Sequence, residues 1–266
     1  MTSKSATDPL FDVEGYVTPV TGGSSGSSGS KDTLFDRNAS ALETVLAEAA
    51  SDGLDIAGYL IDVSDRAALS TAIDNVAQAH GGRLDMLFAN AAVNKPPGFP
   101  SLDSTRCEED AVENIPDALW DRFFAINVFG LLMSLRRAIR IMKRQPDGGR
   151  IVVTSSGAAF RPEPFEGSAY MPSKAVGASL AEIEVPKYLI HVNRGVPGTI
   201  ATNIGGGFIK DKEKSRNFIK KVPMGRADEP EELTAVVLLL GSRQGSAHMT
   251  RSQTKGDGGI LLGSAD

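Results

Sequence analysis

Short runs of apolar residues alternate with longer amphipathic stretches along most of the chain. Short apolar runs bounded by glycine or polar residues are typical of buried strands, and apolar residues three and four apart are typical of helices that cover a sheet. The strands are predicted at residues 16–20, at a second strand ending at 34–36, and at 56–63, 84–89, 151–153 and 188–192, with a last strand before 257–259. The helices are predicted at 38–53, 64–80, 117–142, 168–185 and 231–240. This alternation predicts a doubly wound α/β fold, a parallel sheet with helices on both faces.

Several predicted helices begin at a residue suited to cap them. Asn38 precedes the first, either Ser64 or Asp65 precedes the second, and Asp228 precedes the last. Short polar side chains at these positions accept hydrogen bonds from free amides of the first helical turn. We therefore expect each of these residues to be an N-cap.

The segment between the first two strands breaks this pattern. Only residues 21–33 separate the first strand from 34–36, whereas a strand-helix-strand unit usually takes about 30 residues. The first helix is therefore expected to be largely missing. Residues 23–29 have two interpretations: a flexible Gly/Ser linker, or a glycine turn that brings backbone amides to a phosphate. Pro19 is also unusual in a central strand, because it has no amide hydrogen to donate.

The composition predicts one soluble domain. With 266 residues, 41% of them hydrophobic, the chain can bury one large core. The net charge of −5, and the lack of a basic cluster interleaved with aromatic residues, argue against nucleic-acid binding. Cys107 is the only cysteine, so no disulfide can form within the chain, and the three histidines lack the spacing of metal ligands. The polar start and the short apolar run at 235–240 predict a cytoplasmic protein without a membrane span.

Candidate chemistry lies where the strand at 151–153 leads, through a loop, into the next helix. Ser156 follows the strand, and Tyr170 and Lys174 lie four residues apart, on one helical face. An ammonium beside a phenol favours phenolate; moving a tyrosine pKa from about 10 to about 7 takes roughly 4 kcal/mol, which a nearby cation in a partly dry cleft can supply. The pair is thus a candidate proton donor and acceptor, with Ser156 donating to the same reacting oxygen. The alternative is an ordinary solvated helix face.

Further motifs occur along the chain in a fixed order. Asn90-Ala91-Ala92 follows a predicted strand, Asn127 lies inside an apolar helix, and Pro197-Gly198 is followed by Thr202. Together with the serine, tyrosine and lysine, these motifs resemble the classical short-chain dehydrogenase/reductase family over nearly the whole chain.

That resemblance implies a single NAD(P)-binding Rossmann-fold domain over residues 1–266, with a parallel sheet of about seven strands. Residues 1–14 are expected to form a polar amino-terminal tail, and the loops at 93–115 and 203–222 the rim of the substrate site. In this family, the helices corresponding to 117–142 and to the tyrosine helix form subunit interfaces, so a homo-oligomer, a dimer or tetramer, is expected.

The resemblance also implies a reaction, reversible hydride transfer between NAD(H) and a secondary alcohol or ketone. Tyr170 would exchange the hydroxyl proton, and Lys174 would lower the pKa of Tyr170 and bind the nicotinamide ribose. Ser156 would orient the substrate oxygen, and Asn127 would hold a water that links the lysine to solvent. Ser155 fits the family's spacing to the tyrosine less well than Ser156.

The residues that the resemblance assigns to the cofactor lie mostly at the carboxyl ends of the predicted strands. They are Gly22, Ser24, Ser25, Gly26, Asp36, Arg37, Asp62, Val63, Asn90, Ala91, Tyr170, Lys174, Pro197, Gly198, Ile200 and Thr202. Asp36 favours NAD over NADP, because a carboxylate there binds ribose hydroxyls and repels a 2′-phosphate. Arg37 could instead pair with that phosphate. The third glycine position of the family's turn holds Ser28, and no metal is implied.

Two other functions stay open. One is an NADPH-dependent carbonyl or 3-oxoacyl reductase, which Arg37 would favour. The other is a non-catalytic protein of the same fold with impaired dinucleotide binding, which the short segment at 21–36 would favour. Residues 205–221 are expected to be a mobile segment that covers the substrate. Arg194 is a further departure from the family, because the strand there should be apolar.

Overall fold

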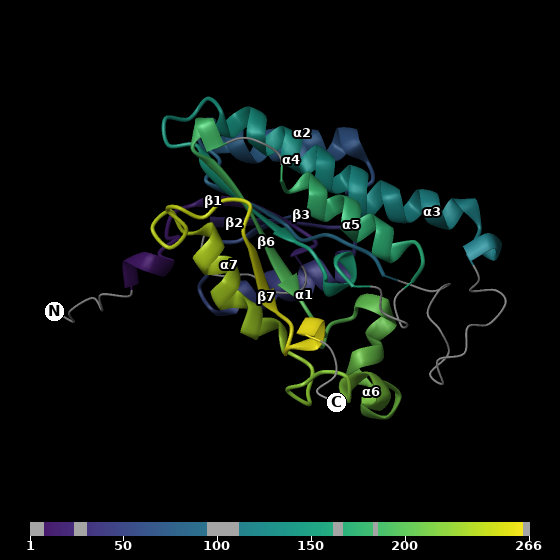
Figure 1. Cartoon of the computed structure of the whole chain (residues 1–266). Helices are drawn as coiled ribbons and strands as arrows, with labels where there is room; N and C mark the ends of the chain where they lie inside the picture. The colour runs from purple at the N-terminus through teal and green to yellow at the C-terminus, as the bar shows by residue number, and fades with distance from the viewer. Residues whose placement is uncertain (1–7, 24–30, 95–111, 162–166, 183–185, 263–266) are drawn as a thin grey trace.

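The computed structural model describes residues 8–23, 31–94, 112–161, 167–182 and 186–262. Seven parallel strands form one sheet in the order β3-β2-β1-β4-β5-β6-β7 (Figure 1). They are β1 Val17–Thr21, β2 Lys31–Asp36, β3 Ala57–Leu60, β4 Met86–Ala89, β5 Gly149–Thr154, β6 Ile190–Pro197 and β7 Gln253–Gly256. The predicted doubly wound sheet of about seven parallel strands is confirmed. The strand order reverses between β1 and β4, the point at which such sheets bind ligands.

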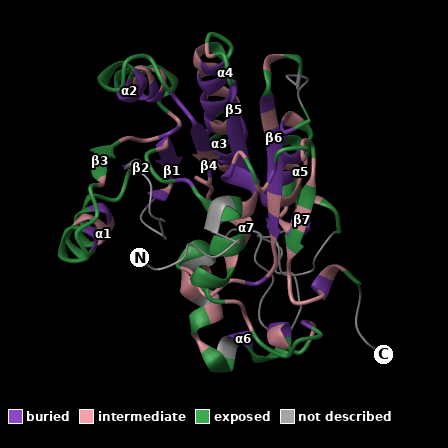
Figure 2. Ribbon diagram, turned by 90° about the vertical axis from the view of Figure 1, so that its left-hand side faces the viewer, coloured by how far each residue is buried: buried purple, intermediate pink, exposed green. Residues whose placement is uncertain are grey.

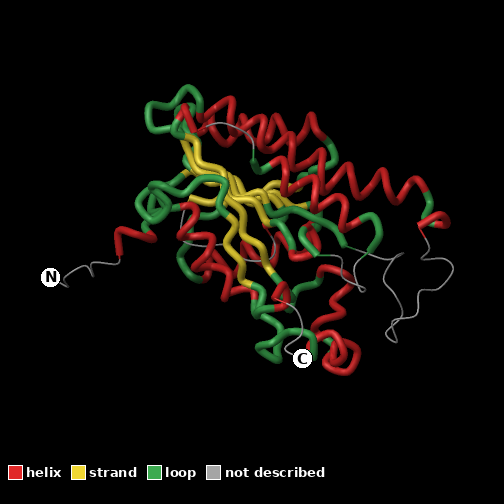
Figure 3. The backbone as a smooth tube through the Cα atoms, in the orientation of Figure 1, coloured by secondary structure: helices red, strands yellow, loops and turns green. Residues whose placement is uncertain are grey.

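Helices cover both faces of the sheet, so that the strands form the middle layer (Figures 1 and 3). Helices α2, α4 and α5 lie above the sheet in Figure 1, and α1 and α7 lie below it. The helices are α1 Ala39–Ser51, α2 Arg66–Ala79, α3 Asp117–Phe124, α4 Leu131–Met142, α5 Tyr170–Leu180, α6 Lys212–Ile219 and α7 Thr234–Gly241. Short 3-10 turns lie at Asp8–Phe11, Val112–Asn114, Gly157–Ala159, Pro186–Tyr188, Ile204–Lys210, Pro230–Leu233 and Ile260–Leu262.

Two of the predicted helix caps are present. The side chain of Asn38 accepts a hydrogen bond from the amide of Ala41 at the start of α1, and Asp65 caps α2. The prediction for Asp228 was wrong, because Glu229 is the cap of the turn that leads into α7. Asp228 instead forms an isolated parallel bridge with Ile200, outside the sheet, so its backbone is already paired.

The buried apolar residues that pack on the sheet form one large cluster and two smaller ones, and the ribbon in Figure 2 shows buried residues along the strands and on the helix faces toward them. The large cluster lies under α2, α4 and α5 and includes Leu69, Leu87 and Leu135, all almost fully buried. The edge strand β3 is shorter than the predicted 56–63, and its Tyr59 is 48% exposed. A strand at the sheet edge has a neighbour on one side only, which limits its length.

The short connection between β1 and β2 agrees with the sequence. The two strands pair in parallel, and only residues 22–30 separate them. Most of that connection, 24–30, lies outside the described residues, and with it the prediction of a largely missing helix. Pro19 lies opposite Thr33 of β2, and the pairing of β1 with β4 begins only at Val20. The proline therefore sits before the β1–β4 ladder.

The predicted helix at 117–142 has a different geometry in its middle. Residues Ala125–Gly130, between α3 and α4, form a π-helical segment that contains Asn127. Such segments are rare and are frequent at functional sites. The whole span Asp117–Met142 is long and apolar enough to cross a membrane by length and composition alone, but its carboxyl half packs on the sheet through buried residues such as Leu135 and Met142.

One further prediction in the carboxyl half needs correction. Strand β6 begins at Ile190, not at residue 188, and continues past residue 192 to Pro197, so that Arg194 is part of it. The segment 205–221 contains most of the 3-10 turn at Ile204–Lys210 and helix α6, and its mobility stays a prediction. Helix α6 has buried anchors, because Phe218 and Val222 pack with Ile260 near the chain's end.

Candidate active site

Tyr170 and Lys174 meet at the carboxyl edge of the sheet, on the first turns of α5. The Tyr170 side chain is 5% exposed and Lys174 is 6% exposed. Lys174 Nζ donates a hydrogen bond to the carbonyl oxygen of Thr154 at 3.0 Å, where β5 ends. The same nitrogen lies 5.8 Å from the centroid of the Tyr170 ring. The pair is thus a buried cation beside a phenol, not a solvated helix face.

The two serines after β5 differ in their surroundings. Ser156 is half-buried, and its Oγ accepts a hydrogen bond from the amide of Ala158 at 3.2 Å. That bond orients the side chain and leaves the hydroxyl proton free to be donated. Ser155 is 3% exposed, and its Oγ has no hydrogen-bond partner among the described residues.

Asn127 ties the loop after β4 to the tyrosine helix. Its Oδ1 accepts from the Val93 amide at 2.9 Å, and its Nδ2 donates to the Val93 carbonyl at 3.0 Å and to Ser173 Oγ at 2.9 Å. Ser173 Oγ in turn donates to the carbonyl of Tyr170 at 2.7 Å. The amide is therefore satisfied by protein groups. The Asn127 carbonyl faces α5, 3.8 Å from where a Cβ on Gly177 would lie.

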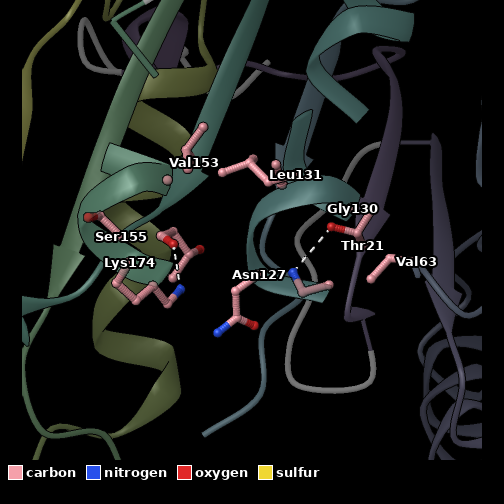
Figure 4. Close-up of a pocket in the computed structure, with 12 residues that line it drawn as sticks. Thr21, Val63, Asn127, Gly130, Leu131, Val153, Ser155 and Lys174 are labelled. Carbon is pink, nitrogen blue, oxygen red and sulfur yellow. Dashed lines mark hydrogen bonds between the residues drawn. The ribbon is translucent and has the colours of Figure 1, made fainter. Parts of the chain in front are cut away.

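A small cavity of about 10 Å³ lies at this edge of the sheet (Figure 4). Lys174, Ser155 and Asn127 line it, together with residues from β1, β4 and the π segment. About 10 to 15 Å³ of such space is what one water molecule needs, provided that polar partners surround it. The cavity therefore has the size and lining for a single water beside the lysine.

A chain of polar contacts joins the carboxyl ends of β1, β4 and β5. Thr21 Oγ1 accepts from the amides of Asn90 and Ala91 at 3.1 and 3.2 Å. Asn90 Nδ2 donates to the carbonyl of Gly22 at 3.0 Å, and Asn90 Oδ1 accepts from Thr154 Oγ1 at 2.9 Å. Gly22 has a φ of 68°, and a Cβ there would lie 2.9 Å from Ala91 Cα. Only glycine fits this turn, which opens the connection to β2.

Two carboxylates follow β2 and β3 at the same edge. Asp36 Oδ1 accepts from the amide of Asn38 at 2.9 Å, which orients the side chain at the end of β2. Burial raises the pKa of Asp62, but hydrogen bonds from Ser64 and the charge of Arg37 outweigh burial, so that the pKa lies below its usual range. Asp62 is therefore a carboxylate at neutral pH, with Arg37 nearby. Val63, also assigned to the cofactor, is buried and lines the small cavity.

The turn after β6 packs tightly against the end of β7. A Cβ on Gly198 would lie 2.6 Å from Asp257 Cα, so a glycine is required there. Thr202 is half-buried, and its amide donates to the carbonyl of Ile200. Burial, the largest cause, and the charges of Glu232 and Asp257 raise the pKa of Asp228 beside this turn. The predicted nicotinamide side of the site, from Pro197 onward, is thus a rigid turn.

Comparisons with known proteins agree with this architecture. A family model described as "Enoyl-(Acyl carrier protein) reductase" matches residues 27–260. An L-rhamnose 1-dehydrogenase (NAD(P)(+)) from a Sphingomonas species is 31% identical over 206 residues, which cover 76% of this chain and 74% of the relative. The chain belongs to the short-chain dehydrogenase/reductase family.

Two other relatives of this dehydrogenase/reductase span nearly its whole length. The crystal structure of a short-chain type dehydrogenase/reductase from Mycobacterium marinum, 26% identical, has a TM-score of 0.80 and covers 96% of this chain and 99% of that chain. A galactitol 2-dehydrogenase (L-tagatose-forming) from Cereibacter sphaeroides is 28% identical over 95% of this chain and 98% of the relative. As a member of this family, the protein is an oxidoreductase.

The sequence-predicted residues of this dehydrogenase/reductase fall into two groups. The first group lies at one edge of the sheet, as described above. It consists of the residues after β1, β4, β5 and β6 and the residues on α5 and the π segment. Ser24, Ser25 and Gly26 lie outside the described residues, as does most of the rim loop at 93–115. The residues available at this edge fit a dinucleotide, because a turn glycine, a carboxylate after β2 and a switch point occur where such a ligand needs them.

Sequence reasoning missed three residues that hold this site together. Thr21 Oγ1 accepts hydrogen bonds from two amides of the loop after β4, and the Thr154 carbonyl accepts one from Lys174. Ser173 Oγ accepts one from Asn127 and so connects it to α5. A threonine at the end of two predicted strands was a usable signal, since parallel strands end at the same edge. Nothing local distinguishes Ser173 from a surface residue of α5.

Proposed function

We propose that this dehydrogenase/reductase transfers a hydride between NAD(H) and a secondary alcohol or ketone. The observation that carries the proposal is the buried Lys174 ammonium, hydrogen-bonded at the end of β5 and 5.8 Å from the Tyr170 ring. A cation in this position favours the phenolate, which a proton acceptor for an alcohol requires. The bound nicotinamide would supply the hydride acceptor.

Each side chain then has one task during oxidation of the alcohol. The Tyr170 phenolate would take the proton from the substrate hydroxyl, while a bound nicotinamide would accept the hydride from the carbon that bears this hydroxyl. The Ser156 hydroxyl would donate a hydrogen bond to the substrate oxygen, and Lys174 would stabilise the phenolate and bind the nicotinamide ribose. Asn127 keeps α5 and the loop after β4 at a fixed distance, next to a cavity that suits one water. That water would connect the lysine to solvent.

We propose a sugar or polyol as the substrate class. The support is that two of the relatives are named as an L-rhamnose dehydrogenase and a galactitol dehydrogenase. Turnover with a panel of aldoses, ketoses and sugar alcohols, measured by NADH absorbance, tests this choice. Oxidation of one of them well above simple secondary alcohols is the expected result. A preference for 3-oxoacyl thioesters with NADPH would instead support the reductase alternative.

The proposed cofactor preference rests on Asp36, which stands oriented at the end of β2. A carboxylate here accepts bonds from ribose hydroxyls and repels a 2′-phosphate. Titrations with NADH and NADPH, monitored by cofactor fluorescence, are expected to show tighter binding of NADH. The Asp36→Ala variant should have a smaller difference in affinity between the two cofactors. An unchanged preference would remove the argument from Asp36, and binding of neither cofactor would favour the non-catalytic alternative.

A homo-oligomer also stays a proposal. Phe129 of the π segment is 40% exposed and Val176 of α5 is 39% exposed, so both helices present apolar side chains to solvent in the single chain. Burial of such side chains between subunits would stabilise an assembly. Sedimentation of the purified protein measures its mass directly.

A further inference from the structure

Arg194 is a charged residue buried within a strand of the sheet. It belongs to β6, and its side chain points to the same face as Ile190 and Val192, which belong to the large apolar cluster. The Arg194 side chain is only 2% exposed. An arginine in a buried strand is costly unless its donors are used. The two Nη atoms of Arg194 have acceptors, whereas its Nε has none among the described residues.

The Arg194 guanidinium reaches the carboxyl end of α5. Nη1 donates to the carbonyl of Ala178, and Nη2 donates to Glu182 Oε1 at 2.9 Å. Its Cζ lies 5.9 Å from the centroid of the Phe160 ring. Arg251 approaches the other oxygen of Glu182, at 3.7 Å, from the solvent side. Arg194 thus links a strand to the last turn of the helix that carries the tyrosine and the lysine.

The last turn of α5 needs such a donor. Carbonyls at a helix carboxyl end have no amide within the helix to bind. The Ala181 amide bonds the Gly177 carbonyl, and the Glu182 amide bonds that of Ser179. The Ala178 carbonyl between them accepts from Arg194 instead. A cation at this end also interacts favourably with the helix dipole.

The contact with Arg194 and the contact of Lys174 attach α5 to neighbouring points of the sheet. Lys174 and Ala178 are one helical turn apart, so they lie on one face of α5. Lys174 bonds Thr154 of β5, and in the sheet register Val153 pairs with Arg194. Two contacts one turn apart fix both the position of the helix along the sheet and its rotation about its own axis.

We propose that Arg194 is a positioning residue that clamps the carboxyl end of α5 to β6 and thereby holds Lys174 beside Tyr170. This inference rests on the proposed function of that pair. Glu182 and Arg251 are the charged groups in contact with this clamp, and the Phe160 ring covers it. When the clamp is lost, α5 is free to turn relative to the sheet, Lys174 loses its bond to the Thr154 carbonyl, and its ammonium is no longer held in place beside the phenol.

The test compares three variants of the full-length protein. Arg194→Met removes the donors at similar length, Arg194→Lys keeps the charge but not the two-armed geometry, and Arg251→Met is the matched control at the exposed arginine. Each is followed by two readouts: the pH dependence of kcat, and ultraviolet titration of the Tyr170 phenol with Tyr170→Phe as the reference. The second readout needs no turnover, so it separates a failure of this inference from a failure of the proposed function.

Arg194→Met is expected to shift the acid limb of the kcat–pH profile and the titration curve of the phenol to higher pH, both by about one pH unit. The value of kcat should fall about tenfold. Arg194→Lys should lie between this variant and the wild type, and it provides the answer if the methionine variant does not fold. Arg251→Met should leave both curves in place. Folded Arg194 variants whose two curves match the wild type would overturn the inference, because a purely structural residue changes stability and not the titration.

Discussion

The two edges of the sheet use buried polar groups in opposite ways. At the amino edge, Asp85 is 2% exposed and its carboxylate accepts from the Val17 amide at 3.0 Å, from Arg83 at 2.8 Å and from Arg243 at 3.3 Å. At the carboxyl edge, the Ser155 hydroxyl has no partner among the described residues and a cavity of about 10 Å³ remains beside Lys174. The Asp85 carboxylate is used by contacts within the protein, although an open hollow of about 1020 Å³ lies beside it, whereas the Ser155 hydroxyl is left without a partner among these residues.

This difference indicates that the buried polar groups at the amino edge serve stability and that those at the carboxyl edge serve the reaction. A carboxylate with several donors has little left to offer a ligand, and it ties together the segments that supply those donors. A hydroxyl without a partner costs stability, which a chain tolerates where the group has another use. We therefore expect substitutions at the amino edge to change the free energy of unfolding, and substitutions at the carboxyl edge to change turnover.

The largest expected effect is that of Lys174→Met at the carboxyl edge. Removing the ammonium removes the stabilisation of the phenolate, so kcat should fall by about 10³. The matched control is Lys187→Met, since Lys187 is an exposed lysine near the amino end of β6 that contacts the Tyr188 ring. Initial rates with a saturating cofactor measure both. Equal rates for the two variants would remove the distinction between the edges.

The second effect is on stability at the amino edge. Asp85→Ala leaves the Val17 amide and two arginines without their shared acceptor, which should lower the free energy of unfolding by about 3 kcal/mol. Urea unfolding measures this change, and Asp147→Ala is the control, because Asp147 is exposed and only its backbone carbonyl accepts from Arg243. Turnover per folded molecule should stay near that of the wild type. A loss of turnover with unchanged unfolding would reverse the assignment of the two edges.

Asn127→Ala is expected to have an intermediate effect. The substitution removes the bonds to Val93 and Ser173 and loosens α5 relative to the loop after β4, so kcat should fall about tenfold. The comparison of kcat with KM for the cofactor distinguishes poorer alignment from poorer binding. A variant with wild-type kcat would show that these contacts serve packing alone.

The smallest effect concerns pH and lies at the amino edge. Burial, the largest cause, and the charge of Arg150 hold the pKa of His191 below its usual range, although backbone contacts with Met249 and Ser246 partly offset them. The unfolded chain therefore takes up a proton at a higher pH than the folded one, so stability should decrease as pH falls below about 6.5. Unfolding at several pH values should show a shallower decrease for His191→Gln. Identical slopes would exclude this residue as the cause.

The sequence was sufficient where local patterns decide the structure. The caps Asn38 and Asp65 were predicted because a short polar residue before an amphipathic stretch has a specific task. The shared face of Tyr170 and Lys174 follows from the pitch of any α-helix. The ends of β2 and β4 were predictable from apolar runs, and parallel strands bring their ends to one edge, but the ends of β3 and β6 were not predicted.

Long-range contacts decide the features that the sequence did not predict. The π segment around Asn127 does not alter the apolar pattern of the helix enough to be seen. Strand β6 continues through Arg194 because Ala178 of α5 and Glu182 just after it accept from its two Nη atoms, and these residues lie outside the strand. Asp228 resembles a cap, yet its backbone pairs with Ile200, so the neighbouring Glu229 takes that role.

The most direct test of the central claim is turnover of Tyr170→Phe measured across pH beside the wild type, with NADH binding measured on the same samples. Tyr170 is buried beside the lysine, and its hydroxyl is the atom that the account assigns to proton transfer. We predict a loss of turnover of about 10³ at every pH, with NADH affinity within about threefold of the wild type. Turnover within about tenfold of the wild type, with an unchanged pH profile, would contradict the account.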